Sequence, residues 1–594
     1  MNKWNEKQLE AIKTTEGAVA VIAGAGSGKS SVLVERNKEL INNGVNENDI
    51  LNITFTNNSA KDLKSKCNKN GIDGVAIGTF HSICKRIMLC EGIDSSKQLI
   101  PYQIENEFKK INKKVNFKEV MSFIGFQKNY GIGINDDFVE KECAYSEYEL
   151  RDYYIAYENL KKKYKCLDFE DWLTITRDIL RNNPNKYTYK YILVDEHQDS
   201  NLIQNDLIQL LCPSGNVFAV FDYRQAIYQF RGGNPSYCMN FKKYFPQAKV
   251  INLNINYRST NNIVVNANEF IKQYYGDYEF YEDSISNNKE DGIIKLLTNI
   301  DKIEESEKIV KSIQQDLKSG LKPNDIAILY RNNINSFETE NMLKQNKIDY
   351  FIEATEGSFF NRKEISCLMC MLRLIDNPED NMAYDTVFNT RVYPFTFISN
   401  DIRDKIRDIS ASKNISLFEA SSIVKTQKSY QRQNLDKFNN VIYDLILQHK
   451  KGVKLNKIIE NIINFIRLDE YIEEKYMGDE LEERKESINS FKSFIRDNTL
   501  ESFLKFVYGS NKSQKKCTKN DIRLMTIHKS KGLEFKKVYL IGIQNGKFPS
   551  TKCSDITEEA RLMYVAVTRS KNDLVVSQIG SGNQFVEEYF RNVE

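Results

Sequence analysis

The stretch AVAVIAGAGSGKSSVLVERNKEL, residues 18–40, decides the fold class. An apolar β-branched run is followed by a glycine-rich loop and then by a helical pattern, which is the order that a phosphate-binding loop requires. Glycines in such a loop allow backbone N–H groups to converge on phosphate oxygens. A lysine there would neutralise the terminal phosphates, and the serine after it would bind Mg²⁺. The residues expected to form this cradle are Ala23, Gly24, Ala25, Gly26, Ser27, Gly28, Lys29 and Ser30.

Two sets of short apolar runs predict two α/β domains with parallel sheets. Each run is followed by a turn and a helical pattern, which is typical of alternating strands and helices. The first set occupies residues 18–23, 50–55, 191–196, 217–222 and 249–254. The second set occupies residues 292–297, 325–330, 522–528, 537–542 and 573–578.

Two long segments between these runs have helical, polar patterns and predict inserted helical subdomains. The first α/β domain is therefore expected in two parts, and so is the second. The expected boundaries are 1–89 and 186–275 for the first domain with its insertion at 90–185, and 276–379 and 516–594 for the second with its insertion at 380–515.

Length and composition exclude several classes of protein. The 594 residues predict several packed units, and 41% apolar with 28% charged residues is typical of a folded globular chain. The chain has no apolar run long enough for a membrane span and no apolar signal-peptide core at its start, so we expect a cytoplasmic protein without a membrane partner. Its 84 basic and 81 acidic residues give a net charge of +3, so a nucleic-acid partner must be argued locally.

A pair of adjacent carboxylates follows the third run of the first set. In YILVDEHQDS, Asp195 and Glu196 come directly after an apolar strand. A nucleotide hydrolase needs a metal ligand and a base that activates water at such a position. Lys29 precedes Asp195 by 195 − 29 = 166 residues, which leaves room for the first helical insertion. The pattern predicts a nucleotide-driven motor with embedded accessory domains.

Ordered motifs along the chain resemble those of superfamily 1 DNA helicases of the UvrD/Rep/PcrA type. They run in the order WNEKQLEAI, GAGSGKS, TFTNNSA, GTFHS, LDFEDWL, VDEHQDS, FDYRQAIYQFRGG, LNINYRS, FFNRKEI, LMTIHKSKGLEF and EEARLMYVAVTRS. The resemblance covers most of the chain. It implies two RecA-like parallel-sheet domains, each with a mainly helical inserted subdomain.

The resemblance assigns roles around ATP and Mg²⁺. Gln8 would read adenine, Tyr257 would stack on the base and Glu534 would contact the sugar. Ser30 and Asp195 would hold Mg²⁺. The catalytic residues that the resemblance implies are Lys29, Asp195, Glu196, Gln225 as a γ-phosphate sensor, and Arg258 and Arg569 as arginine fingers.

The same motifs imply a path for single-stranded DNA, in which aromatic side chains stack on bases. The residues placed along that path are Phe55, Thr79, His81, Tyr228, Phe230 and His528. A buried core role is the alternative for Phe55 and Tyr228, because each follows apolar residues. His81, His197 and His528 fall inside these motifs, which favours site roles for them over isolated core positions, although His197 could occupy a variable slot.

Two functions share these motor residues. The first is an ATP-dependent helicase that moves 3′ to 5′ on single-stranded DNA and opens 3′-tailed duplexes, with the direction implied by the resemblance alone. The second is a DNA-stimulated ATPase subunit that regulates or powers a partner, such as a nuclease, in repair, recombination or phage defence. A P-loop kinase or transporter ATPase is disfavoured, because neither needs GTFHS or QAIYQFRGG. A zinc site at Cys367 and Cys370 is also disfavoured, because CLMC sits in an apolar helical pattern.

Overall fold

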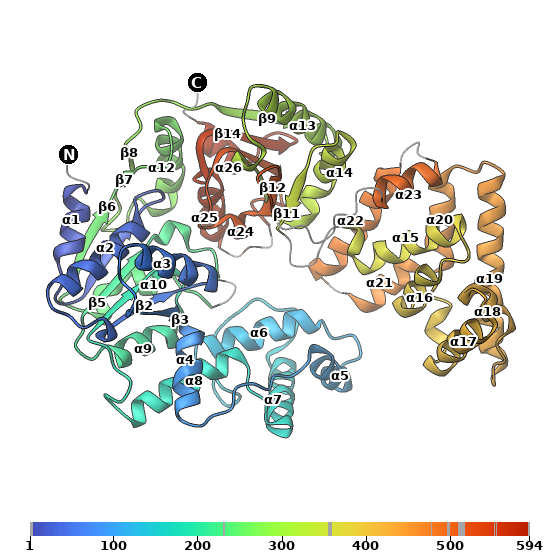
Figure 1. Cartoon of the computed structure of the whole chain (residues 1–594), viewed down its shortest axis with the longest axis horizontal. Coiled ribbons are helices and arrows are strands. Elements are labelled where there is room, and N and C mark those ends of the chain that lie inside the picture. The colour runs from blue at the N-terminus through green and yellow to red at the C-terminus, as the bar shows by residue number, and fades with distance from the viewer. Residues whose placement is uncertain are drawn as a thin grey trace. The chain divides into compact units, whose positions relative to one another are not determined.

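The computed structural model describes residues 4–229, 232–353, 359–476, 478–495, 499–508, 517–551, 553 and 555–591 (Figure 1). The chain divides into two compact units. The first unit combines Met1–Thr298 with Ser530–Glu594, and the second is Asn299–Lys529. The domain boundaries expected from the sequence stay predictions.

A six-stranded sheet forms the centre of the first unit, in the order β3-β2-β4-β5-β1-β6 with all neighbours parallel. β1, β2, β4 and β5 are buried along their whole length, as expected for a parallel sheet covered on both faces. The strands are β1 Val19–Ala23, β2 Ile50–Thr54, β3 Ala76–Thr79, β4 Tyr191–Val194, β5 Val217–Phe221 and β6 Lys249–Leu253. This confirms the five predicted strands of the first set, whereas the short β3 was not predicted.

Helices surround this sheet and connect its strands. Several begin at a side-chain cap, such as Asn5 before α1 and Thr79 before α4, which satisfies backbone N–H groups at the helix start. The helices are α1 Glu6–Lys13, α2 Lys29–Asn42, α3 Asn57–Lys69, α4 Phe80–Cys90, α9 Leu202–Leu211, α10 Ser236–Met239, α11 Phe241–Tyr244 and α12 Asn261–Tyr275.

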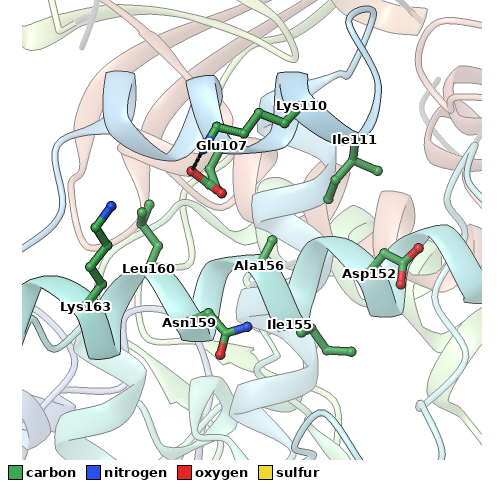
Figure 2. Close-up of a pocket in the computed structure, with 9 residues that line it drawn as sticks. All are labelled: Glu107, Lys110, Ile111, Asp152, Ile155, Ala156, Asn159, Leu160 and Lys163. Atoms are coloured by element: carbon green, nitrogen blue, oxygen red, sulfur yellow. Dashed lines mark hydrogen bonds and ion pairs between the residues drawn. The ribbon is translucent and has the colours of Figure 1, made fainter.

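The first predicted insertion is helical, as expected. Its helices are α5 Pro101–Ile111, α6 Phe117–Asn129, α7 Glu147–Tyr164 and α8 Phe169–Asn182. An apolar cluster centred on Phe108, Val120 and Tyr153 holds α5, α6 and α7 together. Helix α8 packs against α4 and α9 of the main body. A small hollow of about 420 Å³ lies between α5 and α7, with Ile111, Ile155 and Leu160 in its wall (Figure 2).

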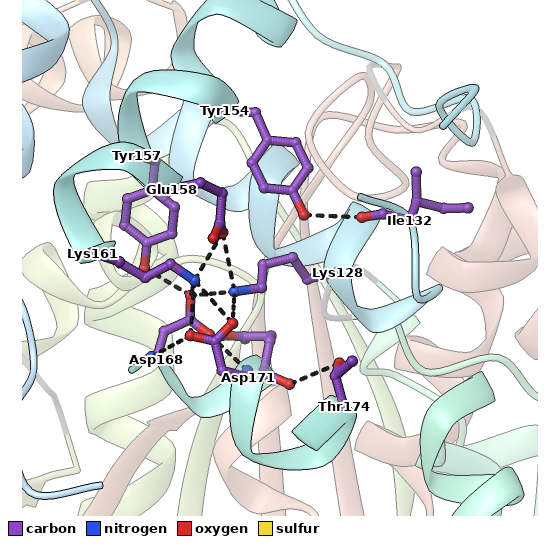
Figure 3. Close-up of polar contacts among 10 residues, drawn as sticks. Lys128, Ile132, Tyr154, Tyr157, Glu158, Lys161, Asp168, Asp171 and Thr174 are labelled. Carbon is purple, nitrogen blue, oxygen red and sulfur yellow. Dashed lines mark hydrogen bonds and ion pairs between the residues drawn. The ribbon is translucent and has the colours of Figure 1, made fainter. Parts of the chain in front are cut away.

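A charged cluster also lies inside this insertion (Figure 3). The carboxylates of Glu158, Asp168 and Asp171 come close enough together to bind a metal ion. Two ammonium groups bind there instead: Lys161 lies 2.9 Å from Asp168 and 2.8 Å from Asp171, and Lys128 lies 2.5 Å from Asp171. Burial alone would lower the pKa of Lys128, but Asp168 and Asp171 raise it well above its usual value. The cluster is therefore a buried ion-pair network that joins α6, α7 and α8.

The last part of the chain completes the first unit. β13 Phe535–Gln544 runs parallel to β14 Ser570–Ile579, and β14 lies between β13 and β9 Ile294–Asn299. Helix α12 packs against α25 Ile556–Val567 and α26 Gln584–Phe590. The two short strands β7 Ile255–Asn256 and β8 Ile285–Ser286 pair in parallel. Residues more than 300 positions apart are thereby brought together within one unit.

The second unit has a small parallel sheet and a helical block. β12 Ile522–Thr526 pairs with β10 Ile326–Tyr330 on one side and β11 Tyr350–Ile352 on the other. α13 Lys302–Lys318 packs against α14 Phe337–Gln345, and α24 Ile527–Ser530 follows β12. Together with β9, β13 and β14, these strands confirm the second predicted set, while β11 was not predicted.

A large apolar core holds the helical block together. α15 is its central helix, and Cys367 and Cys370 are buried there as their apolar pattern predicts. The helices are α15 Lys363–Asp376, α16 Asn381–Thr390, α17 Asn400–Lys413, α18 Leu417–Ile423, α19 Ser429–Lys450, α20 Leu455–Phe465, α21 Leu468–Lys475, α22 Gly478–Ile495 and α23 Leu500–Tyr508. Among the described residues, no helix combines the length and the apolar character that crossing a bilayer needs.

Candidate functional site

The glycine-rich loop joins β1 to α2 in the conformation of an anion cradle. Gly26 and Gly28 have positive φ angles of 72° and 83°, and Gly28 caps α2. A Cβ on Gly26 would lie 2.7 Å from the Asn256 side chain, so no other residue fits there. The helix that begins at Lys29 adds its N-terminal N–H groups and the positive end of its dipole. The residues present fit a bound polyphosphate.

The two carboxylates at the end of β4 are in different states. Burial, and then the charge of Glu196, raise the pKa of Asp195 to about 7. Burial would also raise the pKa of Glu196, but Lys29 and then Lys531 outweigh it and lower this pKa to about 2. Lys29 Nζ lies 3.7 Å from Glu196 Oε1. The two shifts run in opposite directions, so Glu196 stays ionised at neutral pH, whereas Asp195 holds its proton more strongly than an ordinary carboxyl group.

Glu196 is held in an uncommon backbone conformation. Its φ of 52° lies in the left-handed region that a residue with a side chain rarely adopts. Gln198 Nε2 donates a hydrogen bond of 2.5 Å to Glu196 Oε2. Such strain at a functional position indicates that the surrounding structure determines the direction of the side chain.

Gln225 is the meeting point of several segments. Its amide Nε2 donates to Asp222 Oδ2 over 2.7 Å, and its Oε1 accepts from Arg569 over 2.9 Å. Its backbone carbonyl accepts from Lys531 Nζ over 2.7 Å. A residue that follows β5 is thus held by two cations from the C-terminal part of the chain.

Arg258 and Arg569 gather positive charge in the same region. Arg258 Nε lies 2.7 Å from Glu534 Oε2, and its NH1 donates to the Thr568 carbonyl. Arg569 is 1% exposed; burial, and then Arg258, lower its pKa to about 9. A guanidinium cation that is destabilised by burial and by a neighbouring cation would be stabilised by a bound anion such as a triphosphate.

The proposed base-binding residues lie beside the loop. Gln8 is buried, and its Nε2 donates to the Ser27 carbonyl over 3.1 Å. Tyr257 is 47% exposed, and its backbone N–H donates to Gly26. Asn5 donates to the Tyr257 hydroxyl over 2.9 Å. The structure therefore brings Gln8 and Tyr257 to the glycine-rich loop, where the exposed Tyr257 ring is accessible for stacking.

Four of the residues expected along the DNA path, Phe55, Thr79, His81 and Tyr228, lie in the first unit. Phe55 and Tyr228 stack with ring centroids 5.1 Å apart, and Lys531 Nζ lies 5.2 Å from the Tyr228 ring. His81 lies edge-on to Phe169 at 5.7 Å, and burial lowers its pKa. Thr79 acts as the N-cap of α4, with its hydroxyl bound to Ser82.

Three of the expected residues border a hollow of about 720 Å³. Phe55, Thr79 and His81 line it together with Phe126 of α6 and Phe169 of α8. Phe230 lies outside the described residues. His528 belongs to α24 in the second unit.

Two basic residues that the sequence reasoning missed contact the segment Gln225–Gln229. Lys531 binds Asp199 as well as the Gln225 carbonyl. Arg561 donates to the Ala226 carbonyl over 2.5 Å and to Gln229 Oε1 over 2.6 Å. Both fall inside quoted motifs, KSKGLEF and EEARLMYVAVTRS, but a motif does not reveal which distant residue a side chain will contact.

His197 proves to be a core residue. It is 1% exposed, and its ring packs edge-on against Phe241 at 5.8 Å and lies 6.4 Å from Phe221. Burial lowers its pKa to about 4, so the imidazole is neutral at physiological pH. Its position in a motif therefore reflects packing.

The family models match this chain in two consecutive parts. The model described as the UvrD/REP helicase N-terminal domain matches residues 4–246, and the UvrD-like helicase C-terminal domain matches residues 251–581. The chain belongs to the family of UvrD-like helicases.

Named relatives extend over nearly the whole chain. The ATP-dependent DNA helicase Rep of Buchnera aphidicola subsp. Schizaphis graminum is 31% identical, over 99% of this chain and 94% of its own. The ATP-dependent DNA helicase PcrA of Staphylococcus aureus is 29% identical, over 98% of this chain and 84% of its own. The putative ATP-dependent DNA helicase YjcD of Bacillus subtilis is 30% identical, over 96% of this chain and 78% of its own.

Proposed function

We propose that this protein is an ATP-dependent DNA helicase that moves 3′ to 5′ on single-stranded DNA. The observation that carries the proposal is that Lys29 lies beside Glu196, that Arg569 binds Gln225, and that Arg258 acts on Arg569. Three cations from distant parts of the chain suit the charge of a triphosphate. The direction of movement rests on the resemblance to UvrD-like helicases.

The chemistry assigns a separate role to each residue. Lys29 and the two arginines stabilise the charge that develops on the transferred phosphoryl group. Glu196 accepts the proton of the attacking water. When phosphates engage Lys29, Glu196 loses the cation that lowers its pKa most, and it becomes a stronger base.

Ser30 and Asp195 would hold Mg²⁺, because hydroxyl and carboxylate oxygens are ligands that suit this hard cation. Bound there, Mg²⁺ supplies charge neutralisation at the phosphates. Asp195 fits the role: burial and Glu196 raise its pKa, and a nearby divalent cation would favour its ionised form.

Coupling to DNA follows from the segment Gln225–Gln229. Gln225 contacts Arg569 at the nucleotide side, and Tyr228, three residues later, stacks on Phe55 at the DNA side. Lys531 and Arg561 bind the backbone between them. A conformational change at the bound nucleotide would therefore be transmitted from Gln225 to the Tyr228 ring through the short segment that joins them. Thr79, His81, Phe230 and His528 complete the proposed DNA path.

The domain assignment forms part of the same proposal. Residues 1–89 and 186–275 would form the first RecA-like domain, and residues 276–379 and 516–594 the second. The same motor residues would serve if a protein partner, such as a nuclease or a repair factor, acted together with this chain.

Strand displacement on 3′-tailed, 5′-tailed and blunt duplexes tests the proposal. We expect ATP-dependent opening of the 3′-tailed duplex alone, with Lys29→Ala as the inactive control. Preferential opening of the 5′-tailed duplex would contradict the direction. ATP hydrolysis without strand displacement, restored by an added partner, would favour the partner-dependent function.

A further inference from the structure

The 720 Å³ hollow beside the stacked rings differs in charge from a phosphate site. Among the described residues that line it, none is a lysine or an arginine. Its wall instead contains aromatic rings, including Phe55, Phe126 and Phe169, and amide side chains such as Asn129. Phosphate groups are usually bound by cations and backbone N–H groups, whereas aromatic rings bind bases by stacking. The lining therefore suits the bases of a strand.

Two carboxylates line this hollow, and they differ in their partners. Asp199 is neutralised by Lys531, at 2.5 Å. Glu170 has no cation bound to its carboxylate in the described part of the chain, although Asp168 and Asp171 beside it are both held by lysines. Burial, and then the charge of Asp168, raise the pKa of Glu170. An unpaired carboxylate next to a polyanion is unfavourable unless a donor group faces it.

Glu170 lies in the wall of the hollow next to an aromatic side chain. It is the second residue of α8, directly after Phe169, whose side chain is 50% exposed. A Cβ placed on Gly125 of α6 would lie 3.7 Å from Glu170 Oε1. The carboxylate thus lies beside α6 at a glycine, which presents no side chain toward it. A stacking ring and an acceptor stand next to each other in the sequence and in the wall.

We propose that Glu170 determines base preference in this hollow, favouring bases that carry an exocyclic amino group over thymine. A carboxylate accepts hydrogen bonds and cannot donate them when ionised. The cytosine N4 amino group and the adenine N6 amino group are donors, whereas thymine presents the O4 oxygen at that position. In a single strand these edges are free to be read. The inference rests on the proposed function, since it requires single-stranded DNA in the hollow.

Two oligomers that differ only at the Watson–Crick edge of the base provide the test. Oligomers of about ten nucleotides are made of thymidine or of 5-methyldeoxycytidine, which keeps the methyl group, replaces the O4 oxygen by an amino group and has an N3 acceptor in place of the thymine N3–H donor. Binding is measured by fluorescence anisotropy at mildly alkaline pH for the full chain. We expect the unmodified chain to bind the 5-methyldeoxycytidine oligomer about fivefold more tightly.

Variants assign that preference to one side chain. Glu170→Gln keeps the size and adds donor hydrogens, so we expect the two affinities to become equal within about twofold, and Glu170→Ala should do the same. Glu105→Gln is the matched control, because Glu105 pairs with Lys109 on the surface of α5. It should retain the full preference. The salt dependence of affinity should be the same for both oligomers, because phosphate contacts do not change.

Three results would overturn the inference while leaving the proposed function intact. They are equal binding of both oligomers by the unmodified chain, a preference that survives in Glu170→Gln and Glu170→Ala, and a preference accompanied by different salt dependences. Failure to bind either oligomer would contradict the proposed function itself, which separates the two conclusions.

Discussion

The proposed nucleotide site and the proposed base hollow, which is the 720 Å³ hollow lined by Phe55, Phe126 and Phe169, lie in the same unit and differ in charge. The nucleotide site gathers Lys29, Arg258 and Arg569, and burial with Arg258 lowers the pKa of Arg569 to about 9. The base hollow has aromatic walls and, among its described lining, no basic side chain. A nucleotide and a strand share phosphates, sugars and bases, so the charge of a site decides which part it binds. The cations should control turnover, and the rings should control strand affinity.

The largest expected effect is at Lys29. Lys29→Ala should lower DNA-stimulated ATP hydrolysis on the order of 10³-fold, because the ammonium stabilises phosphoryl charge in the transition state. Single-strand affinity should change by less than about twofold, since aromatic rings and not this cation contact the bases. Lys38→Ala, at an exposed position of the same helix, is the control. A parallel loss of strand affinity would break the separation between the two sites.

Variants of Glu196 and Asp195 should differ in the Mg²⁺ concentration that their ATPase activity requires. Glu196→Gln should hydrolyse ATP about 10²-fold more slowly with an unchanged Mg²⁺ requirement, because the amide keeps the shape and cannot accept the proton. Asp195→Asn should need more Mg²⁺ for half-maximal activity. Steady-state ATPase titrated with Mg²⁺ distinguishes them. Identical Mg²⁺ curves for both variants would refute the split of roles.

The stacked rings of Phe55 and Tyr228 should contribute to the affinity for single-stranded DNA. Tyr228→Leu should weaken single-strand binding about tenfold, because base stacking on one aromatic ring contributes on the order of 1–3 kcal/mol. ATPase in the absence of DNA should stay within about twofold. Tyr148→Leu is the control, since Tyr148 is 76% exposed on α7. An unchanged strand affinity would show that the Phe55–Tyr228 pair is core packing.

The smallest effect concerns the Asp199–Lys531 ion pair between the two sites. Burial raises the pKa of Asp199 from 3.8 to about 6, so the carboxylate that binds Lys531 exists above about pH 6 and is lost below it. The ratio of DNA-stimulated to unstimulated ATPase should therefore fall severalfold as pH drops through about 6. In Asp199→Asn this ratio should be low and independent of pH. A fall of equal size in both proteins would assign it to another group.

Packing explains which elements the sequence could predict. Runs such as 18–23 and 217–222 are buried along their length, so their β-branched residues are recognisable without knowledge of their neighbours. β3 and β11 have four and three residues, and none of the three in β11 is fully buried. Such short strands form because a longer strand beside them supplies hydrogen bonds, and that strand is distant in the sequence.

The cradle residues and the acidic pair were recognisable because their function needs particular residue types at fixed local spacing. Gly26 and Gly28 show this most directly, since their positive φ angles belong to the turn itself. The close approach of Asn256 to Gly26 is, by contrast, a contact with the distant strand β7. Asp195 and Glu196 follow one strand for the same reason. Their opposite pKa shifts, however, depend on burial and on Lys531, which lies 335 residues after Glu196.

Tertiary structure alone decided which distant side chains meet. Arg569 contacts Gln225 and Arg561 contacts Gln229, across separations of 344 and 332 residues. His197, inside a motif, became a core ring because aromatic residues of two other segments pack around it. Local patterns specify backbone conformation and the chemistry a segment can offer. The electrostatic environment of each group is a property of the space around it, which only the folded chain defines.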